Sequence, residues 1–196
     1  NTILLDGGMG TMLQAAGLKL GAKPEELNIT DPALIEGIHA KYAAAGSRIV
    51  NANTFGASAH KLADSAYSLE EIIAAGIANC KRACAPYGAL TALDVGPLGE
   101  LLEPNGTLLF EDAVAEYARI VRAGVDAGAD LIFFETFTDL YELKAALLAA
   151  TENSTLPILA SMSFEAGGRT FTGCTVESFG VTARGLGANA VGINCS

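Results

Sequence analysis

The sequence predicts an α/β protein, a TIM-type (β/α)8 barrel of which about six strands are present. Short apolar segments alternate with helix-like segments along the chain, a pattern typical of parallel strands joined by crossover helices. A polar side chain lies near the end of each predicted strand. A barrel gathers all such ends at one shared mouth, whereas an open sheet concentrates them at one switch point. The spread of polar ends therefore favours the barrel.

Six segments have the apolar character of buried strands. The fourth, 131–134, is apolar on both faces, as expected for a parallel strand that is covered on both sides. The predicted strands are 2–5, 48–52, 89–95, 131–134, 158–162 and the stretch from Ala190 that ends in Asn194-Cys195-Ser196. Their polar ends are Asp6, Asn53, Asp94, Glu135, Ser163 and Asn194.

Helices are predicted between these strands from their capping signals. Ser68-Leu69-Glu70-Glu71 forms a capping box, which opens a helix that runs to about Ala85. The other predicted helices begin at Thr30 or Asp31 with Pro32 in the first turn, span 111–127, run from Thr138 or Asp139 to about Ala150, and begin at Thr175.

The predicted barrel is incomplete. A full barrel has eight strands and about 250 residues, whereas this sequence has six predicted strands in 196 residues. We therefore expect residues 1–196 to form one barrel domain that is truncated at its C-terminal side.

Composition excludes several classes of function. The net charge of −10 leaves no basic cluster to neutralise phosphates, which argues against nucleic-acid or anionic-membrane binding. No apolar run approaches the roughly 20 residues of a membrane helix, and the first residues lack a secretion signal. The four cysteines lack the spacing of a secreted scaffold. We expect a cytoplasmic protein.

The glycine-rich turn Gly7-Gly8-Met9-Gly10-Thr11 follows the first predicted strand. A dinucleotide fingerprint needs a third glycine at the position of Leu13 and an acidic residue after the second strand, and both are missing. A phosphate-binding P-loop is excluded as well, because no lysine follows the glycines. The turn offers close backbone approach and amide N–H groups to a ligand; a tight turn without a ligand is the alternative.

Three strand ends carry reactive groups. Glu135 follows four apolar residues, and a carboxylate there needs a partner; the partner is the ammonium group of a small substrate or a basic side chain of the protein. Asp6 poses the same question, and could orient a ligand or hold the glycine turn. Cys195 could be a nucleophile, a metal ligand or a buried thiol that fills a gap.

The other titratable residues receive no catalytic role. Cys80 and Cys84 share one helix face, and packing or exposure is favoured over a metal site. Cys174 lies in a loop. We expect His39 and His60 in polar helical surroundings and Glu25-Glu26 on a solvated face.

Taken together, the strand ends resemble those of the homocysteine S-methyltransferases. Six segments fall in order over the whole chain, which makes the match specific although each motif is weak alone. They are 5–11, Asn53-Thr54-Phe55-Gly56-Ala57, Gly96-Pro97-Leu98-Gly99, Glu135-Thr136-Phe137, Ser161-Met162-Ser163-Phe164 with Gly168-Arg169-Thr170, and 192–196. Segments 12–14 and 27–32 are most similar to the homocysteine-binding modules of cobalamin-dependent methionine synthases.

The resemblance implies a zinc-dependent methyl transfer to the thiol of homocysteine, which forms methionine. Cys195 matches the first of three zinc cysteines; the other two, an adjacent pair at the eighth strand, are absent from this sequence. Zinc would deprotonate the thiol, which then attacks an electrophilic methyl group. Substrate contacts are implied for Asp6, Gly7, Gly8, Asn53, Glu135, Thr136 and Asn194.

The resemblance also implies the partners. Homocysteine is the small-molecule substrate, and the methyl donor is another module of the parent protein, with its cobalamin, or a small molecule. Because two zinc ligands are missing, we expect these 196 residues alone to bind zinc poorly and to be inactive.

Three alternatives stay open. The first is a betaine- or S-methylmethionine-dependent homocysteine methyltransferase. The second is a non-catalytic barrel fragment whose exposed edges are covered by a partner chain. The third, an unrelated barrel enzyme of aldolase or isomerase type, ranks last because no lysine or histidine stands at a strand end.

Overall fold

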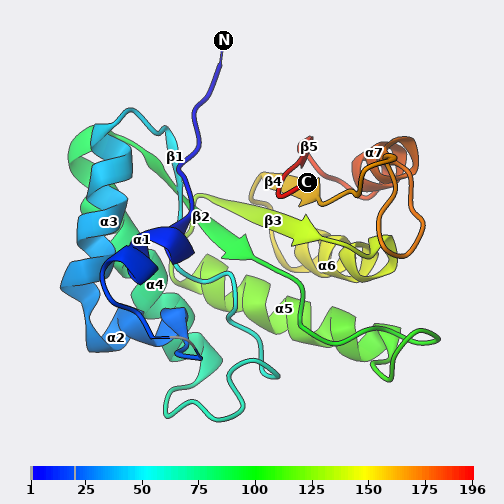
Figure 1. Ribbon diagram of the computed structural model, residues 1–196, viewed down its shortest axis with the longest axis horizontal. Helices are drawn as coiled ribbons and strands as arrows, with labels where there is room; N and C mark the ends of the chain where they lie inside the picture. The colour runs from blue at the N-terminus through cyan, green and yellow to red at the C-terminus, as the bar shows by residue number, and fades with distance from the viewer. Residues whose placement is uncertain (1, 20) are drawn as a thin grey trace.

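The computed structural model describes residues 2–19 and 21–196, and it shows one parallel sheet with helices along one face (Figure 1). Every strand pairs in parallel with the next along the chain, in the order β1-β2-β3-β4-β5. The α/β class and the parallel topology predicted from the sequence are confirmed. The strands are β1 (Ile49–Asn51), β2 (Leu90–Val95), β3 (Leu131–Phe137), β4 (Ile158–Met162) and β5 (Ala190–Ile193).

The helices begin at the predicted caps. Asp31 accepts a hydrogen bond from the Leu34 N–H at 3.2 Å, and Ser68 and Glu71 form the reciprocal capping box. The helices are α1 (Met9–Ala15), α2 (Leu27–Thr30), α3 (Pro32–Ala44), α4 (Leu69–Cys84), α5 (Phe110–Asp126), α6 (Leu140–Asn153, capped by Asp139) and α7 (Val176–Gly185, capped by Thr175), with short 3-10 turns at Pro24–Glu26 and Ala85–Tyr87. Helices α1 and α2 were not predicted.

Alternating side chains along the strands build two separate cores. One set points outward and packs under the helices; it includes Val50, Leu93 and Phe134, all fully buried. The other set, with Ala92 and Phe133, forms a smaller cluster on the inner face of the sheet. Two apolar faces on one parallel sheet are what a barrel wall requires.

Segment 2–5, predicted as the first strand, does not form a strand of the sheet. The segment lies beside β1 but pairs through a single parallel bridge, Leu5 with Ile49. In a parallel ladder the next bond would run from the Asn51 N–H to the main-chain oxygen of Asp6. Instead the Asn51 N–H donates to the Asp6 side chain at 3.0 Å, and the ladder stops there. The sheet therefore has five strands and one bridged segment within the described residues.

Both edges of the sheet carry exposed apolar side chains: Ile3 and Leu4 beside β1, and Val191 and Ile193 on β5. The sheet is thus an open arc rather than a closed ring. Within the described ranges, no helix is long and apolar enough to cross a membrane.

Candidate functional site

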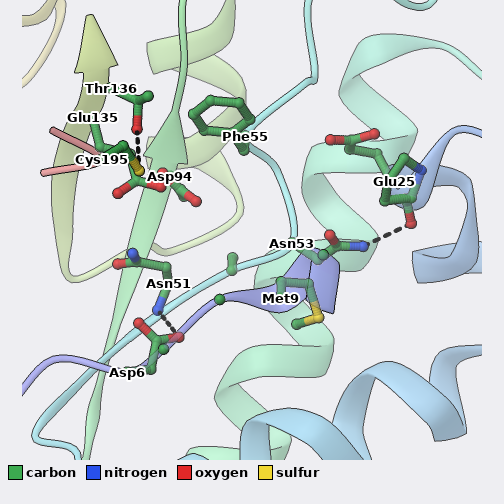
Figure 2. A pocket seen from close by; sticks show the side chains of 15 residues that line it. Asp6, Met9, Glu25, Asn51, Asn53, Phe55, Asp94, Glu135, Thr136 and Cys195 are labelled. Carbon is green, nitrogen blue, oxygen red and sulfur yellow. Dashed lines mark hydrogen bonds between the residues drawn. The ribbon is translucent and has the colours of Figure 1, made fainter. Parts of the chain in front are cut away.

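The segment after Leu5, the carboxyl ends of β1, β2 and β3, and Cys195 after β5 surround one cavity of about 450 Å³ (Figure 2). A volume of this size suits a small organic ligand. Polar groups that are up to 189 positions apart in the sequence, from Asp6 to Cys195, line it. Of the six predicted polar strand ends, Asp6, Asn53, Asp94 and Glu135 line this cavity, whereas Ser163 and Asn194 do not. The polar lining residues are Asp6, Glu25, Asn51, Asn53, Asp94, Glu135, Thr136 and Cys195.

Asn194, at the end of β5, links the groups on this side of the cavity. Its side-chain oxygen accepts from the Thr136 N–H at 3.2 Å and from the Ser161 hydroxyl at 2.9 Å. Its NH₂ group lies 3.1 Å from Glu135 Oε2 and 2.8 Å from Thr136 Oγ1. Asn194 does not line this cavity itself; its side-chain amide orients Glu135 and Thr136, which do.

Thr136 and Cys195 share an unusual backbone conformation. Their φ angles are 64° and 51°, in the left-handed region that β-branched residues in particular avoid. The two side chains face each other, with Thr136 Oγ1 3.9 Å from Cys195 Sγ (Figure 2). Such strain persists where surrounding contacts enforce it, and it is concentrated at functional sites. Here the Asn194 contacts to Thr136 enforce it.

Glu135 and Asp6 are carboxyls without a basic partner at the cavity. Burial raises the pKa of Glu135 above its usual range. Burial likewise raises the pKa of Asp6 to about 7, and the hydrogen bond from the Asn51 N–H opposes that rise. No lysine, arginine or histidine is found among the described lining residues. In this structure the partner of Glu135 is the Asn194 amide, which donates to Oε2 at 3.1 Å.

The glycine turn lies at the same cavity, but Gly7 is needed for a different contact. A Cβ at Gly7 would come within 2.9 Å of the Tyr42 ring, so the close approach is to a side chain of α3. Gly8 accepts hydrogen bonds from the Tyr42 hydroxyl at 3.2 Å and from Thr11 Oγ1 at 3.1 Å. The turn is thereby fixed against α3, with Gly7, Gly8 and Gly10 exposed along the cavity.

Asn53 lies at the cavity wall and its amide is occupied by protein groups. Its NH₂ donates to the Pro24 carbonyl at 2.8 Å and to Asn28 Oδ1 at 3.0 Å. Asn28 in turn donates to the Asn53 carbonyl at 2.8 Å. This buried network ties the 24–28 segment to the end of β1, so Asn53 shapes the wall.

Several features of the site were not predicted. Glu25 was expected on a solvated face, which is wrong: it is 7% exposed, lines the cavity and accepts from the Gly56 N–H at 2.7 Å. Phe55 covers Gly96, where a Cβ would meet its ring at 2.6 Å, and Lys61 Nζ lies 5.2 Å from the ring centre. Asp94 was recognised as a strand end but given no role.

The remaining cysteines and histidines lie away from the mouth. Cys80 and Cys84 face each other at 3.8 Å inside the outer core, which confirms packing. Cys174 is half-buried in a loop, with its thiol 3.2 Å from the Thr175 carbonyl. His39 was expected in polar surroundings; instead it is fully buried on α3.

Cys195 by itself does not complete a metal site. Its thiol is exposed and lies near two donors, Asn194 Nδ2 at 3.6 Å and Thr136 Oγ1 at 3.9 Å. Zinc needs three or four protein ligands, and the described residues contain no group of three potential ligands that could hold a metal ion. Among the described residues, Cys195 alone is a candidate zinc ligand at this site, which is fewer than zinc needs.

Fold and site together define a partial (β/α) barrel protein with a small-molecule site at the carboxyl ends of its strands. The chain belongs to the homocysteine S-methyltransferase family, whose sequence model matches residues 3–196. The resemblance seen in the sequence is thereby confirmed.

Two curated relatives are methionine synthases. The one from Mycobacterium tuberculosis is 31% identical over 209 aligned residues, and the one from Mycobacterium leprae is 30% identical over 212. In both cases 97% of this chain is covered, but the chain spans only 17% of the relative's length.

Among solved structures, the Escherichia coli homocysteine methyltransferase MmuM has the same fold. Its oxidized form superposes with a TM-score of 0.88 at 24% identity, covering 98% of this chain and 73% of MmuM. Its metallated form gives 0.86 at 22% identity, with 100% and 75% covered. These matches confirm the partial barrel.

Proposed function

We propose that this chain binds homocysteine and presents its thiol for methylation to methionine, as the homocysteine-activating module of a cobalamin-dependent methionine synthase. Membership of the homocysteine S-methyltransferase family and the two methionine synthase relatives support this proposal. The observation that carries it is the Glu135–Asn194–Cys195 arrangement, which places a carboxylate and a thiol side by side at the mouth.

The roles follow from the chemistry of the lining groups. Glu135 would accept the substrate ammonium, held in place by Asn194 and aided by Thr136. The turn that contains Asp6, Gly7 and Gly8 would receive the amino-acid end through its main-chain N–H groups. Asn53 would fix the opposite wall. The homocysteine sulfur would then point toward Cys195, and the site's contribution to rate is positioning and the exclusion of water.

Zinc dependence is part of the proposal, with Cys195 as one ligand. Two further cysteine ligands would come from outside residues 1–196, and cobalamin would be held by other modules of the parent protein. The metallated form of MmuM supports a metal in this fold. Because the described residues supply a single ligand, we expect the 196-residue chain alone to be inactive.

A cytoplasmic location belongs to the same proposal. All four cysteines are free thiols, as expected in a reducing compartment.

The test is Cys195→Ser in the full-length protein, with zinc content and methionine formation measured together. We expect both to be lost, because the serine hydroxyl is a far weaker zinc ligand than a thiolate. Cys174→Ser is the matched control, since it removes a half-buried loop thiol and should leave both unchanged. Normal zinc content in Cys195→Ser would contradict the assignment. Supplying methylcobalamin, S-methylmethionine or betaine as donor in the same assay separates the three donor classes.

A further inference from the structure

Phe55 is the only aromatic side chain among the described residues that line the 450 Å³ cavity (Figure 2). The residue is 36% exposed, so its ring offers the cavity an apolar surface. The ring packs on Gly96, where an added Cβ would lie 2.6 Å from a ring carbon, and the Gly96 N–H donates to the Phe55 carbonyl at 3.0 Å. The residue that follows β2 thereby supports one side of the ring.

Lys61 contacts the same ring and is not among the residues that line the cavity. Its Nζ lies 5.2 Å from the ring centre, within the range of a cation–π contact, and donates to the Pro97 carbonyl at 2.6 Å. Its stem passes over Gly99, where an added Cβ would lie 3.2 Å from Lys61 Cε. One ammonium group thus joins the Phe55 ring to the Gly96-Pro97-Leu98-Gly99 motif, to which the proposed function assigns no role.

Two buried carboxylates fix the charge of this ammonium group. Burial lowers the pKa of Lys61, and the carboxylates of Glu25 and Glu142 oppose this effect. Glu25 is 7% exposed and Glu142 is 4% exposed. Glu142 also accepts from the Leu98 N–H at 2.7 Å and from the Tyr117 hydroxyl at 2.9 Å. Because buried charges are paired in proteins, the cation is held at this position behind the cavity wall.

We propose that Lys61 is a positioning residue of the site, which holds the Phe55 ring as the surface on which the methylene groups of the bound amino acid pack. The inference rests on the proposed function for the identity of that amino acid. It goes further in assigning roles to two residues outside the acidic part of the mouth. A contact with methylene groups is the same before and during methyl transfer, so its loss raises KM and leaves kcat unchanged.

Substitutions in the full-length protein test the contact between the two side chains. Lys61→Met removes the charge and keeps an unbranched stem, and Phe55→Leu removes the ring. The double variant completes a cycle that measures their coupling. Lys81→Met is the matched control, because Lys81 also donates to a main-chain carbonyl, that of Gly128, and pairs with Asp130 at 3.2 Å, but at the amino end of the sheet.

Methionine formation gives KM for homocysteine and kcat for each variant. We expect Lys61→Met to raise KM about tenfold, about 1.4 kcal/mol, with kcat unchanged. Phe55→Leu should raise KM at least as much. The double variant should resemble Phe55→Leu, because Lys61 acts through the ring. Lys81→Met should keep the wild-type KM. A purely structural role of Lys61 would lower kcat through loss of folded protein and leave KM unchanged.

A measurement without substrate tests the positioning separately from the proposed function. 4-Fluorophenylalanine at position 55 reports the environment of the ring by ¹⁹F NMR, and thermal unfolding of each variant shows that it is folded. We expect the ¹⁹F resonance to shift or broaden in Lys61→Met, because the cation and the bond to the Pro97 carbonyl are lost. The resonance should stay in place in Lys81→Met.

Three results would overturn the inference: an unchanged ¹⁹F resonance in folded Lys61→Met, additive effects of the two substitutions on KM, or a higher KM for the methyl donor alone. The proposed function fails separately. If the resonance responds but the wild type does not methylate homocysteine, the contact of Lys61 with the ring stands and homocysteine is the wrong substrate. If the wild type methylates homocysteine and Lys61→Met does so with the same KM, the substrate stands and the role of Lys61 is wrong.

Discussion

The two ends of the sheet use the same residue types in opposite ways. At the amino end, Asp130 and Asn189 stand directly before β3 and β5, and each accepts a main-chain N–H of the neighbouring strand. Asp130 Oδ2 accepts from Thr91 at 2.8 Å, and Asn189 Oδ1 accepts from Ile158 at 2.8 Å. At the carboxyl end, Asp94 and Asn51 leave an acceptor unpaired beside a cavity.

The backbone shows the same contrast. The non-glycine residues with positive φ in the described chain, Thr136 and Cys195, both lie at the carboxyl end. Paired polar groups stabilise the fold, whereas unpaired and strained groups cost stability and are retained where a ligand uses them. In barrels the amino face is accordingly associated with stability and the carboxyl face with function. The following changes test this division.

The largest effect on ligand affinity is expected for Asn194→Ala. The substitution removes the group that holds Glu135 and Thr136, and a hydrogen bond to a charged group contributes about 1.5–3 kcal/mol. Homocysteine affinity should fall about a hundredfold, about 2.7 kcal/mol, in a calorimetric titration. Asn189→Ala, at the other end of the same strand, should leave affinity unchanged. Equal effects of the two substitutions would refute the division.

His39 tests whether an unpaired polar group away from the cavity affects stability alone. Neither of its ring nitrogens has a partner among the described residues, and burial lowers its pKa from 6.5 to about 4, against a small opposing effect of Glu36. Above pH 6.5 the imidazole is neutral in both states. As the pH falls toward 4, the unfolded chain takes up a proton that the native state does not, so the free energy of unfolding decreases by up to about 3 kcal/mol.

Replacing this residue should remove that decrease. In urea unfolding at several pH values, His39→Leu should lose about 3 kcal/mol less than the wild type between pH 6.5 and pH 4, with homocysteine affinity at pH 7 unchanged. His60→Leu, on the exposed surface, is the control. A pH dependence of His39→Leu identical to that of the wild type would show that the buried imidazole is not responsible.

Asp130→Ala should lower the stability of the fold by a smaller amount and leave ligand binding unchanged. It removes the acceptor for the Thr91 N–H and the partly exposed ion pair with Lys81. The free energy of unfolding, measured in urea, should therefore fall by about 2 kcal/mol. Homocysteine affinity should not change. Asp126→Ala, exposed at the end of α5, should alter neither quantity. A loss of affinity in Asp130→Ala would mean that the amino end also serves the site.

Much of the fold could be predicted because strands and caps depend on local sequence. The capping box at Ser68 and the strand 158–162 need no information from distant residues. Segment 2–5 was predicted as a full strand, but it pairs with β1 through the single bridge of Leu5 with Ile49, and the ladder does not continue because the Asn51 N–H, 45 residues from Asp6, donates to the Asp6 side chain. Strand β3 runs on to Phe137 across an irregularity, which the apolar run 131–134 does not reveal.

The site was predictable where a residue stood at a strand end, as Asp6, Glu135 and Cys195 do. Glu25 was missed because its burial depends on the Gly56 N–H, which the surrounding acidic sequence does not indicate. Asp94 and Asn51 carried a usable signal, their position at the ends of β2 and β1. Their unpaired acceptors, however, become visible only once the neighbouring strands are in place.

A crystal structure of the full-length protein with homocysteine tests the central claim most directly, because it locates the ligand relative to the two ends of the sheet. We predict the ammonium nitrogen within hydrogen-bonding distance of Glu135, with the sulfur directed toward Cys195. Homocysteine bound away from this cavity, or bound in it with its carboxylate toward Glu135, would contradict the account.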